Sequence, residues 1–380
     1  MASLPVDITL NILSRLPVKS LVRSRCVCKS WNSLIRSPSF IKMHLNHWSN
    51  FPGVDVYNYA DDCVPQLAMY DPEKSQHHDL DLPIDRPRGM NIEVIGSCNG
   101  VLCLSTYNED NHDDSKIFLW NPFINELESL PESAYPVWRS IGFGWNDSAG
   151  GGLGEFKVVN INVTGKCPDK SSQVEVFSQR KNSWSQLGNT LPPACRNHHL
   201  GAQVYVQNFI CWCPCVRTDP RYRYAMKAWL VLFDVSKEEF HEEELPDTMP
   251  GEDKYIAVLD GCLSVIAQSR QPEFKGYEVW VMKEFGSFHS WTKLYTIATS
   301  YDPCHRPLGF TSSRKLLFMR NFYIGLRFGS LTYLVLYDHT RDEFDSFSRR
   351  NRKGSFYKSR MVNHVASLVS PRAYREIPVA

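Results

Sequence analysis

One phrase recurs six times along this chain, and it constrains the fold more than any other feature of the sequence. Each copy is a short apolar run, a polar turn and a second run that is apolar or aromatic. An aromatic residue marks the first run of each copy, at Tyr70, Trp120, Phe177, Phe233, Trp280 and Tyr337. The steps between these positions are 50, 57, 56, 47 and 57 residues. Apolar runs of this length, bounded by turn residues, predict β-hairpins at a regular interval.

Two more β-rich runs precede the hairpin in several units, such as 141–145 and 156–159 before Phe177. Four strands in a repeat of about fifty residues are typical of a kelch-like β-propeller, whose radial sheets leave few exposed edges. The first unit has little room before Tyr70, so we expect a strand near 362–369 to complete it and close the ring. The double-glycine signature of kelch repeats is absent, and a pair of β-sandwiches is therefore the alternative.

The first fifty residues follow a different pattern. Apolar residues such as Ile8, Ile12 and Leu16 recur at helical spacing, and Pro17 ends the first run. Isolated helices below about 12–15 residues are marginal in water, so these need mutual packing and a partner. The helices expected are 5–16, 18–25, 26–35 and one that begins near residue 37. The sequence thus predicts a small all-α module at 1–46, followed by an all-β kelch-like β-propeller of about six blades at 50–375.

Charge is divided unevenly between these two parts. Residues 1–50 hold seven basic side chains and one acidic one, Asp7, out of 42 basic and 41 acidic residues in the chain. The head therefore carries a net charge of +6 and the remainder −5. Such asymmetry indicates a separate module with an acidic partner, either a protein or a nucleic acid.

The head resembles the F-box motif from end to end, in Leu4-Pro5, Leu16-Pro17, the runs 19–23 and 27–31, and Leu34-Ile35. In that family the module binds a Skp-type linker protein, which connects it to a cullin and a RING subunit. The resemblance assigns nine residues to the linker-binding surface or its immediate support: Leu4, Pro5, Ile8, Leu16, Pro17, Leu21, Val27, Trp31 and Leu34. The residues expected to fill the internal core are Ile12, Leu13 and Val22. A DNA-binding helix-turn-helix would also explain the positive charge, but the predicted third helix has a mostly apolar face instead of polar side chains for base edges.

With the propeller included, most of the chain resembles the plant F-box proteins that carry an F-box-associated (kelch-like, type 1) domain, including the S-locus F-box group. The phrases that carry this resemblance are 96–103, 120–122 and 141–144. It implies a non-catalytic substrate-recognition subunit of an SCF-type (Skp-cullin-F-box) E3 ubiquitin ligase, which binds a target protein for ubiquitination and proteasomal degradation. An S-ribonuclease is one candidate target, and we expect no nucleic-acid or membrane partner. The alternative is an interaction or lectin-like ligand-binding propeller outside any ligase, with a helical docking head.

Specificity in such an adaptor is expected on loops that a rigid ring holds in place. In kelch order, the loops between blades and those that join the second and third strands share one face. Arg, Tyr and Trp, which are enriched at interface hot spots, occur in these predicted loops together with His. The recognition residues predicted are Trp138, Arg139, Arg196, His198, Arg217, Arg221, Tyr222, Arg223, His305 and Arg306.

No catalytic, metal or cofactor site is predicted. The run Cys211-Trp212-Cys213-Pro214-Cys215 lacks the second half of a zinc pattern and is interpreted as reduced thiols. A propeller enzyme would need a convergent metal or acid/base cluster, which the sequence does not reveal. Twelve cysteines without a secretory signal indicate a reducing compartment, so we expect the cytoplasm, the nucleus or both. No apolar run approaches the roughly 20 residues that cross a bilayer.

Overall fold

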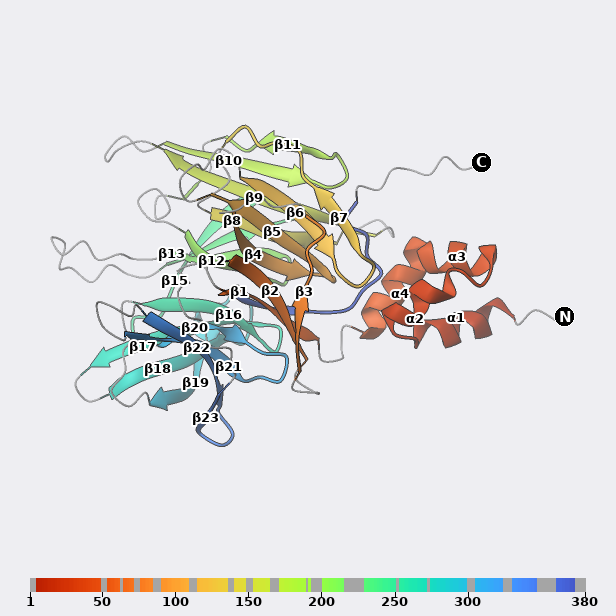
Figure 1. The fold of residues 1–380 in the computed structure, drawn as a ribbon. Coiled ribbons are helices and arrows are strands. Elements are labelled where there is room, and N and C mark those ends of the chain that lie inside the picture. Colours follow the sequence, from red (N-terminus) through yellow and green to blue (C-terminus); the bar gives the residue numbers. More distant parts are fainter. Residues whose placement is uncertain are drawn as a thin grey trace.

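The computed structural model of the chain shows four helices beside a ring of six four-stranded sheets (Figure 1). The predicted fold class, a small all-α head followed by a six-bladed β-propeller, is confirmed, and the β-sandwich alternative is wrong. The residues that the structure describes are 5–48, 53–61, 64–71, 76–84, 90–108, 115–135, 140–147, 153–164, 171–188, 191–192, 200–214, 229–250, 253–271, 274–298, 305–323, 330–346 and 360–372.

The head consists of α1 (Val6–Ser14), α2 (Val18–Ser24), α3 (Lys29–Arg36) and α4 (Pro38–Trp48). These match the predicted helices, except that the third begins at Lys29 instead of residue 26. Side chains of α4 bond carbonyls at the end of α1, where the helix itself supplies no donors. Trp48 Nε1 donates to the Ser14 carbonyl at 3.2 Å, and His44 Nε2 donates to the Leu16 carbonyl at 3.0 Å. His44 is fully buried, and this burial lowers the pKa of its imidazole.

Each blade of the propeller is an antiparallel sheet, and its inner strand contacts the inner strands of both neighbouring blades. From the inner to the outer strand, blade 2 is β4 (Asn91–Cys98), β5 (Val101–Tyr107), β6 (Lys116–Asn121) and β7 (Glu126–Ser129). Blade 3 is β8 (Ser140–Asn146), β9 (Glu155–Thr164), β10 (Ser171–Ser178) and β11 (Ser183–Gln186). Blade 4 is β12 (Leu200–Val206), β13 (Phe209–Pro214), β14 (Trp229–Asp234) and β15 (Glu239–Glu244).

The remaining blades follow the same order. Blade 5 is β16 (Lys254–Leu259), β17 (Cys262–Gln271), β18 (Phe274–Met282) and β19 (Trp291–Ala298), with the short helix η3 (Phe288–Ser290) before its last strand. Blade 6 is β20 (His305–Phe310), β21 (Leu316–Tyr323), β22 (Ser330–Asp338) and β23 (Glu343–Ser346). Blade 1 is β24 (Met361–His364), β1 (Val54–Asp61), β2 (Val64–Asp71) and β3 (Gln76–Leu80).

Blade 1 closes the ring with strands from both ends of the chain, as predicted. Its inner strand β24 pairs antiparallel with β1, with Val54 opposite His364 and Asp55 opposite Asn363. Asp55 is fully buried, and its Oδ1 accepts the backbone N–H of Ser312 in blade 6 at 3.0 Å. Blade 1 therefore joins strands from the two ends of the chain and is also hydrogen-bonded to blade 6.

Two-residue turns join the first and second strands of several blades. Asn99 and Gly100 have φ values of 48° and 77°, and Asp260 and Gly261 have 52° and 74°. Two consecutive residues with positive φ form the type I′ turn that suits the twist of a β-hairpin, and Asn-Gly and Asp-Gly are its preferred sequences. This explains the Asn99-Gly100 pair in the second blade.

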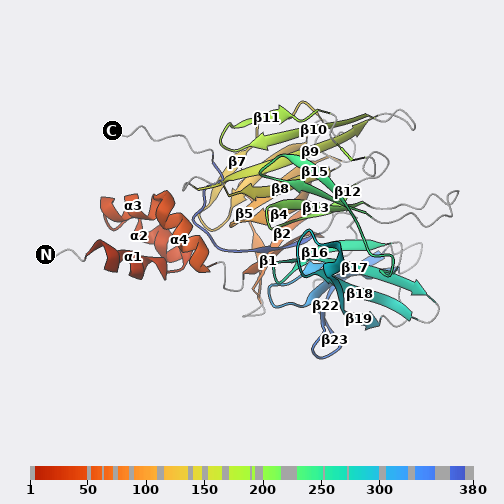
Figure 2. The ribbon, with the colours of Figure 1, turned by 180° about the vertical axis from the view of Figure 1, so that it is seen from behind.

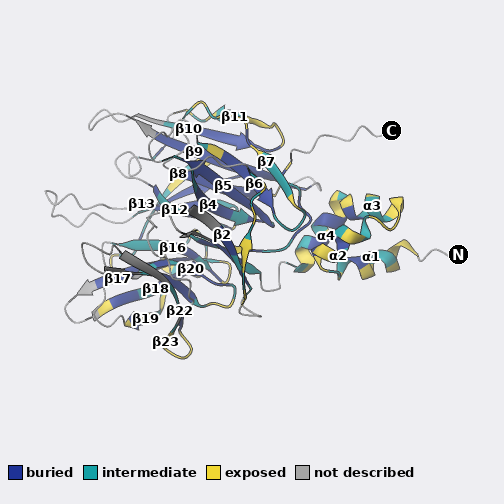
Figure 3. Cartoon of the chain, in the orientation of Figure 1, coloured by how far each residue is buried: buried dark blue, intermediate teal, exposed yellow. Residues whose placement is uncertain are grey.

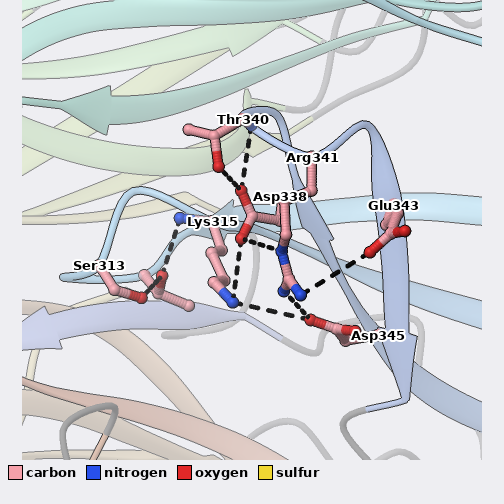
Figure 4. Close-up of polar contacts among 8 residues, drawn as sticks. Ser313, Lys315, Asp338, Thr340, Arg341, Glu343 and Asp345 are labelled. Atoms are coloured by element: carbon pink, nitrogen blue, oxygen red, sulfur yellow. Dashed lines mark hydrogen bonds and ion pairs between the residues drawn. The ribbon is translucent and has the colours of Figure 1, made fainter.

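The turn between the third and fourth strands of a blade begins with a polar residue. This residue directly follows the aromatic residue that marks each repeat. In three blades its Oδ1 accepts a backbone N–H two residues on: Asn121 from Phe123 (3.0 Å), Asp234 from Ser236 (2.9 Å) and Asp338 from Thr340 (3.0 Å). Figure 4 shows the turn of blade 6, where Lys315 and Arg341 also hold the Asp338 carboxylate at 3.2 Å each. Hydrogen bonds from Thr340 first, and then from these cations, lower the pKa of Asp338. The polar residue in the repeated phrase is thus a turn-forming side chain.

Adjacent blades pack tightly where glycine replaces larger side chains. A Cβ added at Gly142 in β8 would lie 2.4 Å from the Trp212 ring in β13, so the indole can pack against that strand only because the residue is glycine. Trp212 is fully buried. Figure 3 shows the consequence on a larger scale, because the blade interiors are largely buried whereas the helices of the head carry many exposed positions.

Candidate docking and recognition surfaces

The head exposes large apolar side chains. Val6, Ile8 and Ile12 on α1 are 66%, 48% and 48% exposed, and Val27 between α2 and α3 is 65% exposed. Ile8 and Ile12 are four residues apart and so lie on the same face of α1. Exposed apolar groups of this size on such a small module are typical of a protein-docking surface. We call these four side chains the docking set.

The nine predicted linker-binding residues fall into three groups. Leu4 lies outside the described residues. Those on the surface are Pro5, Ile8, Pro17 and Val27. Leu16, Trp31 and Leu34 are partly buried against the core, and Leu21 is fully buried, so these four support the surface from inside.

The prediction from the sequence was wrong for one side chain of the head. Ile12 was expected in the internal core with Leu13 and Val22, but it is 48% exposed. Leu13 is fully buried, and Val22 packs partly buried against the same core. Because Ile12 is four residues after Ile8, helical spacing alone already indicated that the two share a face.

The head also exposes basic residues. Those exposed on the head are Arg15, Lys19, Arg23, Lys29 and Arg36. Cys26 and Cys28, which flank Val27, are exposed as well. The Ser30 hydroxyl lies 3.1 Å from Cys28 Sγ, and hydrogen bonds from Ser30 and from the Trp31 backbone lower the pKa of this thiol. The surface therefore combines apolar contacts with positive charge, which suits an acidic protein partner.

The inner side of the head packs on the propeller. One apolar cluster runs from the core of the head, including Leu13 and Phe40, through Leu368 and Val369 into blades 2 and 3. Lys42 on α4 lies 3.5 Å from Asp147, just after the end of β8. Because β8 is an inner strand, its end marks the face of the ring where the first and third turns of each blade lie. The head lies at this face.

The strand ends that flank the predicted recognition residues lie at the opposite face of the ring. Inner strands start there, and second strands end there, as follows from the antiparallel order in each blade. Trp138 and Arg139 precede β8, Arg196 and His198 precede β12, and the other predicted Arg and Tyr residues join β13 to β14. These eight, Trp138, Arg139, Arg196, His198, Arg217, Arg221, Tyr222 and Arg223, lie outside the described residues. His305 begins β20, and Arg306 follows it, partly buried.

A polar cluster crosses the axis of the ring. Gln203 Nε2 in β12 donates to the Ile95 carbonyl in β4 at 2.8 Å, and Arg360 Nη1 donates to the same carbonyl at 3.3 Å. Arg360 Nη2 also lies 3.1 Å from Glu93 Oε1. A cavity of about 240 Å³ lies beside this cluster, lined by β4, β12, β16, β20 and β24. The cluster links blades 1, 2 and 4 across the axis, and nothing in the sequence pointed to it.

The part of the chain that the structure describes contains no group of three or more side chains that could hold a metal ion. In the run of alternating cysteines, Cys211 and Cys213 are buried in β13, and burial raises the pKa of the Cys211 thiol. Cys215 lies outside the described residues. None of the described helices is long and apolar enough to span a membrane.

Two family models match this chain. The F-box domain matches residues 1–43, and the F-box associated beta propeller domain matches residues 55–370. Among proteins of Arabidopsis thaliana, the chain is 26% identical over 317 residues to the F-box/kelch-repeat protein At3g23880, covering 78% of this chain and 79% of that protein. It is 28% identical over 327 residues to F-box protein CPR1, covering 78% and 73%.

Two solved structures illustrate a distant resemblance. YjhT aligns with a TM-score of 0.41 and 11% identity over 69% of this chain and 85% of that one. The Aleuria aurantia lectin in complex with Fucalpha1-6GlcNAc aligns with a TM-score of 0.42 and 8% identity over 80% and 97%. Similarity at this level carries no argument about ligand or activity.

Proposed function

This chain belongs to the F-box proteins that carry an F-box associated beta propeller domain, and from that premise we propose that it is the substrate-recognition subunit of an SCF-type E3 ubiquitin ligase. In this role it has no catalytic chemistry of its own. The head binds a Skp-type linker protein and, through it, the cullin and RING subunits. The propeller binds a target protein for ubiquitination and proteasomal degradation, in the cytoplasm, the nucleus or both.

The docking set is the observation that carries this proposal. Val6, Ile8, Ile12 and Val27 are about half or more exposed in the free chain, although the four helices already share a packed core. A partner that covers them would remove apolar area from water, at roughly 25 cal/mol for each Å². The exposed basic side chains of the head favour an acidic linker, because complementary charge steers association and selects the partner.

The arrangement of the two faces supports the second half of the proposal. The head lies at one face of the ring, and the strand ends that flank the predicted recognition loops lie at the other. A target held on the far face would therefore leave the head free for the linker. Ubiquitin transfer then gains from proximity alone, because tethering raises the effective concentration of the target.

The target is proposed to contact the loops that contain Trp138, Arg139, Arg196, His198, Arg217, Arg221, Tyr222 and Arg223, together with His305 and Arg306. An S-ribonuclease is one candidate, by the resemblance to the S-locus group. Proteomics of cells that lack this chain tests the point, because targets should accumulate and should bind the purified propeller. Accumulation of no protein, with binding of a glycan instead, would favour a ligand-binding propeller outside any ligase.

Co-expression with a Skp-type linker tests the head. The wild-type chain is expected to co-purify with the linker, whereas Ile8→Glu with Ile12→Glu should weaken binding by at least about 100-fold, as hot-spot losses do. Both positions are exposed, so the variant should keep its fold, which circular dichroism checks. Met43→Glu is the matched control, because Met43 is 39% exposed on α4 and outside the docking set.

Failure of the wild type to co-purify would refute the proposal. So would a double variant that binds as tightly as the control. Leu21 is unsuitable for this test, because it is fully buried and its loss would unfold the head.

A further inference from the structure

After the closing strand β24, the chain continues across the ring between the propeller and the head. We call residues 365–372 the strap. Figure 2 shows it beside the head, next to α4, at the face of the ring where the helices lie. Ser367, Leu368 and Val369 are at most 2% exposed. The strap is therefore part of the interface and not a loose tail.

Asn121 in blade 2 holds the middle of the strap. Its Nδ2 donates to the carbonyls of Ser367 at 3.0 Å and Val369 at 2.9 Å, while its Oδ1 accepts the turn N–H of Phe123. The equivalent residues of blades 4 and 6 are Asp234 and Asp338, which form the same turn. Aspartate can accept the turn N–H but has no donor to offer. The amide at position 121 thus adds a function that the turn itself does not require.

Gln179 in blade 3 holds the end of the strap in the same way. Its Nε2 lies within hydrogen-bond distance of three strap carbonyls, those of Ser370 (3.2 Å), Pro371 (3.0 Å) and Arg372 (3.0 Å). Its Oε1 accepts the backbone N–H of Phe156 at 3.1 Å, and the residue is 1% exposed. A second buried amide is therefore shared between the propeller and the strap.

The apolar side chains of the strap complete the link to the head. Leu368 and Val369 belong to the cluster that contains Leu13 and Phe40 of the head, and Ala366 packs against it. The Ser370 hydroxyl of the strap also donates to Glu126 Oε2 in blade 2 at 2.6 Å. The strap is thus hydrogen-bonded to the propeller and packed into the apolar cluster shared with the head.

We propose that the strap fixes the head to the propeller in one orientation, and that Asn121 and Gln179 are positioning residues for ubiquitin transfer. They hold the strap by donating to its carbonyls, and the strap in turn holds the head. The transfer role rests on the proposed function, but the orientation does not. A released strap would leave both binding surfaces intact and let the head move relative to the ring.

Isosteric variants test the two donors. Asn121→Asp and Gln179→Glu keep the oxygen that accepts the local backbone N–H but place a second oxygen against the strap carbonyls. Hydrogen exchange of the strap amides should rise by about tenfold or more in the double variant, because the strap opens more often once the hydrogen bonds that hold its carbonyls are lost. Asp234→Asn is the matched control: it makes the reverse exchange in a blade whose turn does not hold the strap, and should leave strap exchange unchanged.

Single-molecule energy transfer on the full-length free chain measures the orientation. Dyes on non-natural residues at the exposed positions Asn11 in the head and Lys283 in blade 5 should report one narrow distance distribution in the wild type and a broad one in the double variant. Val369→Asp, which alters the strap and neither turn, should broaden it as well. Narrow distributions in these variants, or unchanged strap exchange, would overturn the proposal.

Transfer assays separate this proposal from the proposed function. With linker and target present, the double variant should bind both within about twofold of the wild type, while ubiquitin transfer falls by about fivefold or more as effective concentration drops. If the wild type binds no linker, the proposed function fails, yet the distance measurement still decides whether the strap fixes the head. Unchanged transfer with a mobile head would reject the positioning role.

Discussion

The helical head and the propeller differ in what they do with their apolar side chains. Among the described residues, five large apolar side chains are exposed in the head, against two, Leu294 and Phe344, in the much larger propeller. The propeller stacks six sheets against one another, so both faces of each sheet are covered. The head has four short helices and too little interior for all its apolar side chains.

This difference shows which part of the molecule is complete without a partner. A closed ring can bury its hydrophobic side chains because each blade supplies the neighbour that the next one needs. A four-helix module of this size can bury one side only, and here it uses the strap and the propeller for that purpose. Stability should therefore depend on the propeller interior, and linker binding on the exposed side of the head.

The largest expected effect is in the propeller interior. Trp212 is fully buried and packs over Gly142 of the neighbouring blade. Trp212→Ala would leave a large cavity, so the free energy of unfolding should fall by about 3–5 kcal/mol. Urea unfolding followed by circular dichroism measures it. Linker binding by the head should persist wherever the variant remains folded.

A matched change on the surface sharpens this prediction. Leu294 is 45% exposed on the outer strand of blade 5, and Leu294→Ala should cost less than about 1 kcal/mol. Similar losses for Trp212→Ala and Leu294→Ala would contradict the view that stability comes from contacts between blades.

The ring closure should respond to pH. Burial raises the pKa of Asp55 to about 7, and the hydrogen bond from the Ser312 N–H offsets this only in part. The folded chain therefore favours the protonated acid. Stability from this group is full below its unfolded pKa of about 3.9 and is lost as pH rises through 7. Asp55→Asn removes the ionisation. Between pH 5 and 8 the free energy of unfolding of the variant should therefore rise relative to that of the wild type, by at most roughly 4 kcal/mol.

Urea unfolding of both proteins across that range isolates Asp55, because every other titrating group is common to them. The orientation of a neighbouring amide also matters: with its nitrogen toward the carboxylate, Asn363 donates to Asp55 Oδ1 at 2.7 Å and to the Phe310 carbonyl at 2.9 Å. This donor stabilises the ionised form of Asp55 and would reduce the difference in stability between the two proteins. Parallel stability curves for the two proteins would show that Asp55 is not the group that makes closure depend on pH.

The repeat predicted the ring because the local pattern of apolar runs and turn residues gives the spacing of the strands. The aromatic positions, the turn residues and the closing strand all follow from hydrophobic pattern and turn chemistry. The strap could not be predicted in this way. In the sequence, Asn121 is indistinguishable from a residue that only forms a turn, because its hydrogen bonds to the Ser367 and Val369 carbonyls join distant parts of the chain. The axial contact of Gln203 with Ile95 joins residues 108 positions apart, and no local pattern records such a contact.

The candidate docking surface was predictable in outline for a similar reason. Helical spacing gives the faces of α1, but it does not say which face the rest of the molecule will cover. Ile12 and Leu13 are adjacent and equally apolar, yet one is 48% exposed and the other fully buried. The difference comes from the position of α4 and the propeller. The prediction of the recognition loops rests on side-chain chemistry alone and stays a prediction.

The smallest expected effect concerns the ion pair between the two regions. Lys42 and Asp147 lie 3.5 Å apart, and their side chains are 41% and 67% exposed. Exposed pairs contribute about 0–1 kcal/mol and are screened by salt, so Lys42→Ala should change the free energy of unfolding by less than about 0.5 kcal/mol. Lys29→Ala removes the same charge from an exposed site at the start of α3 and is the control. The strap and the apolar cluster should then keep the dye-to-dye distance distribution narrow in both variants. A broad distribution for Lys42→Ala alone would mean that charge, and not the buried strap, joins the head to the ring.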